Sequence, residues 1–259
     1  RVVVECEQKC RQEGDLYVSE YFTPHGTIKT QTLFTEDMRQ AGITNTHIQE
    51  KAFKSEKDYK ALGYVYEHMK IIPKPEALEV IRNRAKDRGP FIFWVSSEGS
   101  PHHLLSKYLM SFEQFCYEMF DHPEKLQELA DKISLSFHQA LDIGLNSEAE
   151  ILRVGSNYDS MIENPSYFAE HILPVMKKCA EKIHARGKYL LSHTDGENSG
   201  LLDLYVDCGI DIADSVCPAP MTRVSFKEHR DAFRNKVTIY GGVPFIFFLK
   251  DSVSEYDFD

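Results

Sequence analysis

His193 and Asp195 stand two residues apart, just after a short apolar run at residues 189–191. If the strand continues through them, both side chains point the same way, because side chains alternate along a strand. An imidazole and a carboxylate converging on one point are suitable ligands for Zn²⁺, and Cys217 would be a third donor. In the alternative interpretation, Asp195 caps the following helix and His193 bonds a loop carbonyl.

A second group of polar side chains, Asn157, Tyr158 and Asp159, follows an apolar run at residues 151–155. We expect these three residues to line a pocket as catalytic residues, where Asn157 or Asp159 orients a substrate or Asp159 acts as general base. The alternative is that Asp159 only forms a turn, as aspartate often does between a strand and a helix.

Two further segments are candidates for substrate binding. Glu98, His102 and His103 follow the apolar run at residues 91–95, and the alternative for the two histidines is a solvated first turn of a helix. Gly241 and Gly242 follow the last apolar run. Two adjacent glycines suggest a close backbone approach, either to a ligand or to a neighbouring helix.

These candidates share one end of a sheet only if strands and helices alternate. Short apolar runs typical of buried strands occur at residues 91–95, 151–154, 189–191, 210–216 and 237–240, and helical patterns separate them. This order predicts an α/β fold with a parallel sheet and right-handed crossovers, where function collects at the strand ends. Doubly wound sheets and closed barrels both fit, but no Gly-x-Gly-x-x-Gly motif supports the dinucleotide-binding version.

The N-terminal part, about residues 1–70, is less regular. Residues 16–22 alternate between apolar and polar types, residues 23–27 contain proline and glycine, and residues 28–34 are rich in β-branched types. This pattern predicts a β-hairpin, which we interpret as an excursion from a single barrel domain over residues 1–259. The chain begins inside a strand pattern without Met and ends part-way through an element, so we expect a barrel incomplete at both ends.

The composition excludes several classes of partner. The net charge is −10, from 30 basic and 40 acidic residues, and such a surface repels the phosphate backbone of nucleic acids. No apolar run approaches the roughly 20 residues of a membrane span. The six cysteines show no paired spacing, so we expect reduced thiols in a cytoplasmic protein.

At these strand ends the sequence resembles the uroporphyrinogen decarboxylase superfamily, and the resemblance covers nearly the whole chain. The most specific stretch is HARGKYLLSHTDGEN, residues 184–198. Further matches are the Thr23-Pro24-x-Gly26-Thr27 turn, the acidic segment at residues 55–58, NPSYFAEHILPVMKK at residues 164–178 and YGGVP at residues 240–244. The resemblance implies a (β/α)8 barrel of the TIM type.

The superfamily has two main chemistries. Its methyltransferase branch carries a His-x-Cys-Gly zinc motif at this strand end and a later cysteine. His193 matches that motif, Asp195 stands where its cysteine would be, and the later cysteine would fall beyond Asp259. The decarboxylase branch needs no metal and carries a Met-Arg-Gln-Ala-Gly segment whose arginine binds substrate carboxylates. Residues 38–42 have this sequence, with Arg39, but the residues that follow differ from the family's continuation.

We interpret the chain as methyltransferase-like. It would move a methyl group between a small O-, N- or S-methyl compound and a corrinoid (cobalamin) held by a partner protein. His193, Asp195 and Cys217 would hold Zn²⁺ as a Lewis acid. The alternatives are a uroporphyrinogen decarboxylase of porphyrin biosynthesis and a non-catalytic barrel that binds a corrinoid or another small molecule.

Overall fold

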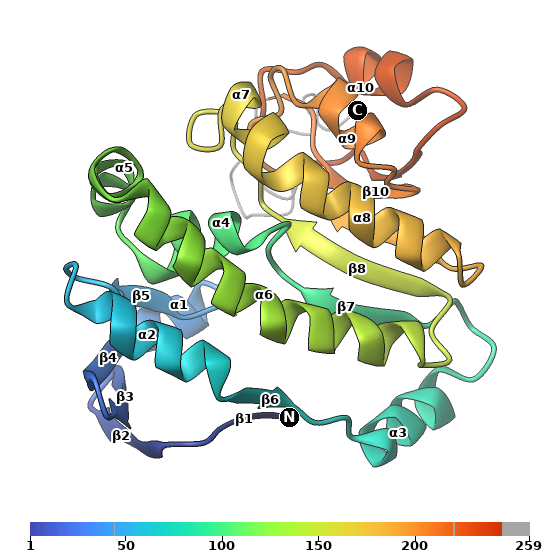
Figure 1. Ribbon diagram of the computed structural model, residues 1–259. Helices are drawn as coiled ribbons and strands as arrows, with labels where there is room; N and C mark the ends of the chain where they lie inside the picture. The colour runs from blue at the N-terminus through green and yellow to red at the C-terminus, as the bar shows by residue number, and fades with distance from the viewer. Residues whose placement is uncertain (44, 220, 245–259) are drawn as a thin grey trace. The chain divides into compact units, whose positions relative to one another are not determined.

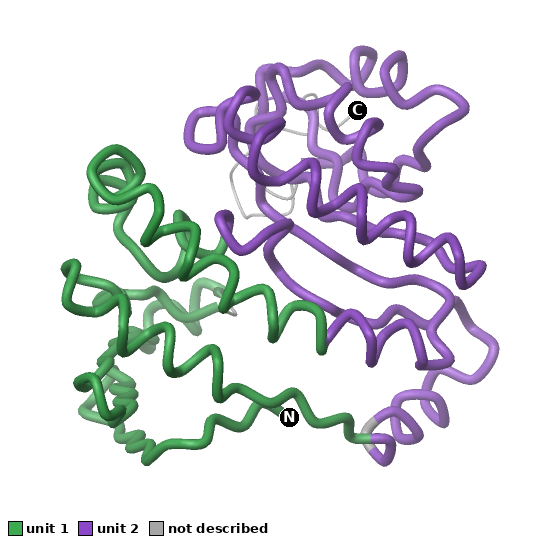
Figure 2. Tube along the Cα trace, viewed as in Figure 1, with its two compact units in different colours: residues 1–74, 104–139 green, residues 75–103, 140–259 purple. Residues whose placement is uncertain are grey.

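The computed structural model describes residues 1–43, 45–219 and 221–244. The chain divides into two compact units, one of residues 1–74 and 104–139 and the other of residues 75–103 and 140–259 (Figure 2). Each unit is described by itself, and the single domain expected over residues 1–259 stays a prediction. No helix among the described residues is both long enough and apolar enough to cross a membrane.

The first unit contains a four-stranded antiparallel sheet in the order β2-β3-β4-β5 (Figure 1). Its strands are β2 (Glu7–Glu13), β3 (Leu16–Thr23), β4 (Gly26–Leu33) and β5 (His47–Glu50). Thr23 pairs with Gly26 across a two-residue turn, which confirms the predicted hairpin. The Thr23 hydroxyl accepts from the His25 amide at 3.1 Å and donates to the Gly26 carbonyl at 2.7 Å, and these bonds close the turn.

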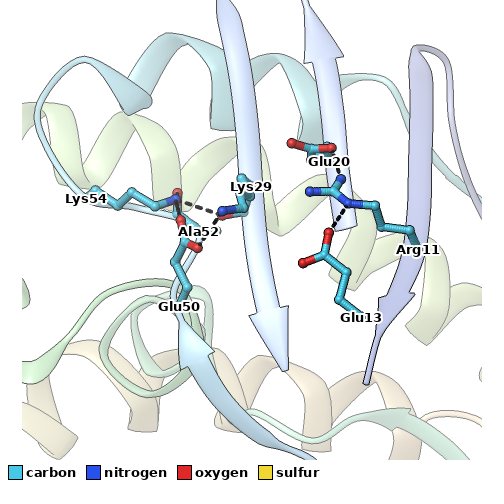
Figure 3. A network of polar contacts seen from close by, with 7 residues as sticks. All are labelled: Arg11, Glu13, Glu20, Lys29, Glu50, Ala52 and Lys54. Atoms are coloured by element: carbon cyan, nitrogen blue, oxygen red, sulfur yellow. Dashed lines mark hydrogen bonds and ion pairs between the residues drawn. The ribbon is translucent and has the colours of Figure 1, made fainter. Parts of the chain in front are cut away.

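Charged side chains join neighbouring strands of this sheet (Figure 3). Arg11 on β2 pairs with Glu13 on its own strand and with Glu20 on β3. Glu50 on β5 lies 3.1 Å from the ammonium of Lys29 on β4 and 3.2 Å from that of Lys54. The outer strand β2 is exposed along its whole length, and its charges disfavour pairing with another chain.

The remaining elements of the first unit are short strands and helices. The strands β1 (Val2–Val4) and β6 (Met69–Ile71) pair antiparallel. Helix α2 (Asp58–Glu67) packs on β3 and β4. The others are α1 (Glu36–Gln40), the π-helical turn η1 (Leu105–Leu109), α5 (Phe112–Asp121) and α6 (Pro123–Leu145), whose last turns belong to the second unit.

The second unit is built on a parallel sheet of five strands that are adjacent in chain order. The strands are β7 (Ile92–Ser96), β8 (Ile151–Ser156), β9 (Tyr189–His193), β10 (Ile212–Val216) and β11 (Thr238–Gly241). The predicted parallel arrangement is therefore confirmed. Parallel neighbours need crossover connections, and helices supply them here.

The helices of the second unit follow the predicted segments. They are α3 (Pro75–Ala85), α4 (Pro101–Leu104), α7 (Pro165–Tyr167), the π-helical turn η2 (Phe168–Ile172), α8 (Leu173–His184), α9 (Leu202–Asp207) and α10 (Phe226–Phe233). Helix α8 packs on β9 and on α9. Buried apolar side chains such as Leu152, Leu190 and Ala213 fill the sheet's core, so the polar strand ends stand on a well-packed base.

Candidate active site at the ends of β9 and β10

The centre of the candidate site is an imidazole between two carboxylates. His193 is the last residue of β9 and pairs in register with Asp214 on β10. Its Nδ1 lies 2.7 Å from Oδ2 of Asp214, and its Nε2 lies 3.2 Å from Oδ2 of Asp195. The three side chains are only 19%, 15% and 29% exposed, so water screens these contacts weakly.

This arrangement holds a proton on His193. Burial alone would lower the pKa of the imidazole, but the hydrogen bonds to Asp195 and Asp214 raise that pKa to about 9. Burial alone would raise the pKa of Asp214, but the hydrogen bond to His193 outweighs burial and keeps this pKa below its ordinary value. At neutral pH the site therefore contains an imidazolium flanked by carboxylates.

The loop after His193 is held by its own polar groups. The Asn198 amide donates to the Thr194 carbonyl at 3.0 Å and accepts from the Tyr205 hydroxyl at 2.7 Å. Glu197 accepts bonds from Ser199, from the Thr222 hydroxyl and from the Arg223 amide. Burial would raise the pKa of Glu197, but these bonds lower it to about 2. Because these residues fix the loop, Asp195 is presented to His193 by a rigid backbone.

The predicted residues after β8 have different positions. The backbone N–H of Asn157 donates to the backbone carbonyl of His193 at 3.1 Å, which brings this loop beside the histidine. Tyr158 is buried, its ring stacks on His103 at 5.0 Å, and its hydroxyl lies 3.3 Å from the Ser192 hydroxyl. The structure thus places Tyr158 in the core, and its catalytic role stays a prediction.

Asp159 has the geometry of the turn-forming alternative. Its Oδ1 accepts from the Met161 amide at 2.9 Å, and its own amide donates to Glu163 at 3.1 Å. These contacts organise the loop between β8 and α7. The role of Asp159 as general base stays a prediction.

The candidates after β7 are more buried than the sequence suggested. His102 is 8% exposed and His103 is fully buried, so the solvated-turn alternative is wrong for both. The His102 ring stacks on His171 at 4.5 Å. Glu98 accepts from the Ser96 hydroxyl at 3.0 Å. Substrate binding by Glu98 and His102 stays a prediction.

Gly241 and Gly242 approach protein atoms closely. Both have positive φ, +135° and +103°, and a Cβ on Gly241 would meet the Val216 backbone at 2.8 Å. The Gly242 amide donates to the Val216 carbonyl at 2.7 Å, and Phe226 of α10 lies beside it. The neighbouring strand and helix therefore account for both glycines, and a ligand role stays a prediction.

The described residues do not fit the expected zinc site. Within residues 1–43, 45–219 and 221–244, no three His, Cys, Asp or Glu side chains are placed to hold one metal ion. Cys217 is buried and is not gathered with His193 and Asp195, and both histidine nitrogens face carboxylates. We derive no step through zinc, and its binding stays a prediction.

Asp214 is the main residue of the candidate site that the sequence did not single out. It belongs to the strand-end segment that includes Cys217, and the cysteine was chosen as the donor. Only the register of β9 against β10 shows that Asp214, three residues earlier, faces His193.

A protein-family model matches most of the chain. The family model described as uroporphyrinogen decarboxylase (URO-D) matches residues 37–253. The chain belongs to this family. No curated protein sequence matches the chain.

A solved structure supports the architecture. The chain is similar to the structure of a methyltransferase from Methanosarcina mazei, with a TM-score of 0.52 at 14% sequence identity. The match covers 93% of this chain and 60% of that protein, so the chain spans about three fifths of its length. At this identity the likeness shows the fold, and the predicted barrel class is confirmed.

The URO-D segment that suggested a decarboxylase lies on a surface helix. Arg39 is on α1, where its guanidinium lies 3.0 Å from Glu36 and 4.9 Å from the ring of Phe34. It is 42% exposed and already has a carboxylate partner.

Proposed function

We propose that this URO-D family chain is a methyltransferase that moves a methyl group between a small O-, N- or S-methyl compound and a corrinoid carried by a partner protein. The observation that carries the proposal is the His193 imidazolium between Asp195 and Asp214. Family membership and the methyltransferase neighbour support the same class.

Demethylation of such a compound leaves an electron pair on the heteroatom. The negative charge that this pair adds to the heteroatom must be neutralised. The bond from the methyl carbon to the heteroatom breaks and its electrons stay on the heteroatom. A reduced corrinoid on the partner protein would supply the electron pair for the new bond to the methyl carbon. His193 donates its Nε2 proton to the heteroatom, and Asp214 holds the ring through Nδ1. In the reverse direction the neutral imidazole takes the proton back.

The carboxylates serve different purposes in this scheme. Asp214 fixes the orientation and tautomer of the ring through the 2.7 Å bond. Asp195 faces the transferable proton at 3.2 Å, so a substrate atom would replace it as partner of Nε2. One Asp195 oxygen is buried without a hydrogen-bond partner among the described residues, which suits a carboxylate that exchanges partners.

Uroporphyrinogen decarboxylation is the second candidate, favoured by the same imidazolium. His193 would protonate the carbon that loses carbon dioxide, which also needs a general acid. The family description and the match at residues 38–42 support this alternative.

The test is methyl transfer to free cob(I)alamin, followed by its absorbance, from a panel of methyl ethers, methylamines and methyl thioethers. We expect one class to react and His193→Gln to reduce the rate at least about 100-fold. His184→Gln is the matched control. His184 Nε2 lies 2.8 Å from Oδ2 of Asp211, and this pair is remote from the carboxyl ends of the strands where His193 lies. This variant should retain the wild-type rate.

Two outcomes would contradict the proposal. Carbon dioxide release from uroporphyrinogen without any methyl transfer would establish the decarboxylase. Binding of cobalamin with neither reaction would favour the non-catalytic barrel.

A further inference from the structure

The guanidinium of Arg153 lies over an aromatic ring on the sheet. It lies on β8 in register with Trp94 of β7, and its guanidinium carbon is 3.9 Å from the centre of the Trp94 ring. The tryptophan is 55% exposed. Stacking of this kind restrains the long arginine side chain and leaves its planar edge available for hydrogen bonds.

The donors of Arg153 are not used within the described part of the chain. The guanidinium makes no hydrogen bond or salt bridge to a described residue, and its Nε is buried without a partner. Arg11, Arg39 and Arg82, in contrast, each pair with a glutamate. A guanidinium has five N–H groups, and leaving a buried one unpaired is unfavourable.

Arg153 shares a sheet face with the candidate active site. It pairs with Leu191 on β9, and His193 lies two residues further along that strand. Residues two apart in a strand point to the same face and are about 6.6 Å apart. Asp214 extends this row on β10 and is influenced by the charge of Arg153, which helps to lower its pKa.

We propose that Arg153, stacked on Trp94, is a carboxylate-binding subsite next to His193, so that the methyl compound handled by this site carries a carboxylate. The substrate class rests on the proposed methyl transfer, whereas the subsite itself does not. A planar guanidinium binds a carboxylate through two parallel hydrogen bonds.

The local charges favour a monoanion over a phosphate. The carboxylates of Asp195 and Asp214 lie beside this subsite. A bound carboxylate brings one further negative charge next to them. A dianionic phosphate would meet stronger repulsion from the two aspartates.

Trp94 provides a direct test because it is the only tryptophan of the chain. Its fluorescence is followed while propionate, or its neutral isostere propionamide, is added at constant ionic strength. We expect a saturable change with propionate and none with propionamide. Ligand-observed NMR on the same samples detects binding that leaves the emission unchanged.

The variants separate the subsite from a general effect of charge. Arg153→Met should weaken propionate binding at least tenfold, and Arg153→Lys should retain part of it because lysine keeps the charge without the planar fork. Arg82→Met, which removes an ion-paired arginine of the same unit, should bind as the wild type does. If Arg153→Met does not fold, the propionate and propionamide comparison and Arg153→Lys still decide.

The proposal is wrong if the wild type does not distinguish propionate from propionamide, or if Arg153→Met binds propionate like the wild type. Arg153 would then serve only as a counter-charge to Asp214. Binding that depends on Arg153 without methyl transfer would keep the subsite and refute the proposed function. Equal methyl transfer from compounds with and without a carboxylate would refute the proposed substrate class and keep the proposed function.

Discussion

At the scale of single residues, the proton on His193 depends on both carboxylates beside it. Asp214→Asn removes one negative charge and should lower the pKa of His193 from about 9 by at least about one unit. The shift is measured by NMR titration of the His193 ring. Asp211→Asn is the control because Asp211 pairs with His184. An equal shift of the His193 pKa in both variants would show that Asp214 does not specifically raise this pKa.

The pH dependence of stability follows from two residues of this site. The folded pKa of His193 is raised from 6.5 to about 9, so its contribution is complete below pH 6.5 and is lost as the pH rises through 9. That contribution is on the order of 3 kcal/mol. The pKa of Glu197 is lowered from 4.5 to about 2, so its contribution is present above pH 4.5 and is lost as the pH falls through 2.

These two residues together place the highest stability between pH 4.5 and 6.5. Urea unfolding at several pH values measures the profile. In this profile of unfolding free energy against pH, Glu197→Gln should reduce the loss of stability at acid pH. His193→Gln should reduce the loss of stability at alkaline pH. A profile unchanged by both substitutions would contradict the assigned ionisation states.

Single residues also show where sequence reasoning succeeded and failed. The importance of the His193 segment was visible because polar residues followed an apolar run. The contact between His193 and Asp214 could not be predicted, because it depends on the register of β9 against β10. A register shift of one residue moves every side chain of a strand to the opposite face of the sheet. The carboxylate, not the nearby Cys217, is the group that this register brings to His193.

At the scale of elements, the loop after β9 and the loop after β8 approach so closely that only glycine fits at Gly196. A Cβ there would collide with the backbone carbonyl of Tyr158, which cannot move like a side-chain tip. Gly196→Ala should therefore destabilise the protein by about 3 kcal/mol and reduce activity by displacing Asp195. Gly89→Ala is the matched control because its Cβ would meet open space, and it should change stability by less than about 0.5 kcal/mol.

Urea unfolding of both variants measures the difference. Equal stabilities would mean that the two loops separate readily, and the rigid presentation of Asp195 would then be wrong.

The order and type of the elements in the second unit were predictable because each strand is a continuous apolar run and each long helix has an apolar stripe. The hairpin was predictable from its turn residues. The π-helical turn η2 was not, because the pattern from Asn164 onward is that of one regular helix. Pro174 near the start of α8 lacks an amide donor, and the wider turn before it accommodates the missing bond.

At the scale of the whole molecule, helix α6 belongs to both compact units, since the division falls between residues 139 and 140. In the first unit, Gln139 bonds the backbone of Ile71 at 3.0 Å and that of Met69 at 3.1 Å. In the second, a Cβ on Gly144 would lie 2.9 Å from Phe93 and 3.0 Å from Leu152 of the parallel sheet. Gln139 thus contacts residues of the first unit, and Gly144 lies against residues of the second.

We expect this helix to couple the unfolding of the two units. Leu135→Pro removes a helical hydrogen bond and should cost about 3 kcal/mol or more. Leu135→Ala is the control, because this side chain is 48% exposed and contributes little to the core. Hydrogen exchange should then accelerate in the proline variant both in α2 of the first unit and in β8 and β9 of the second. Acceleration confined to the first unit would show that the parallel sheet, with its His193 site, is stable without the shared helix.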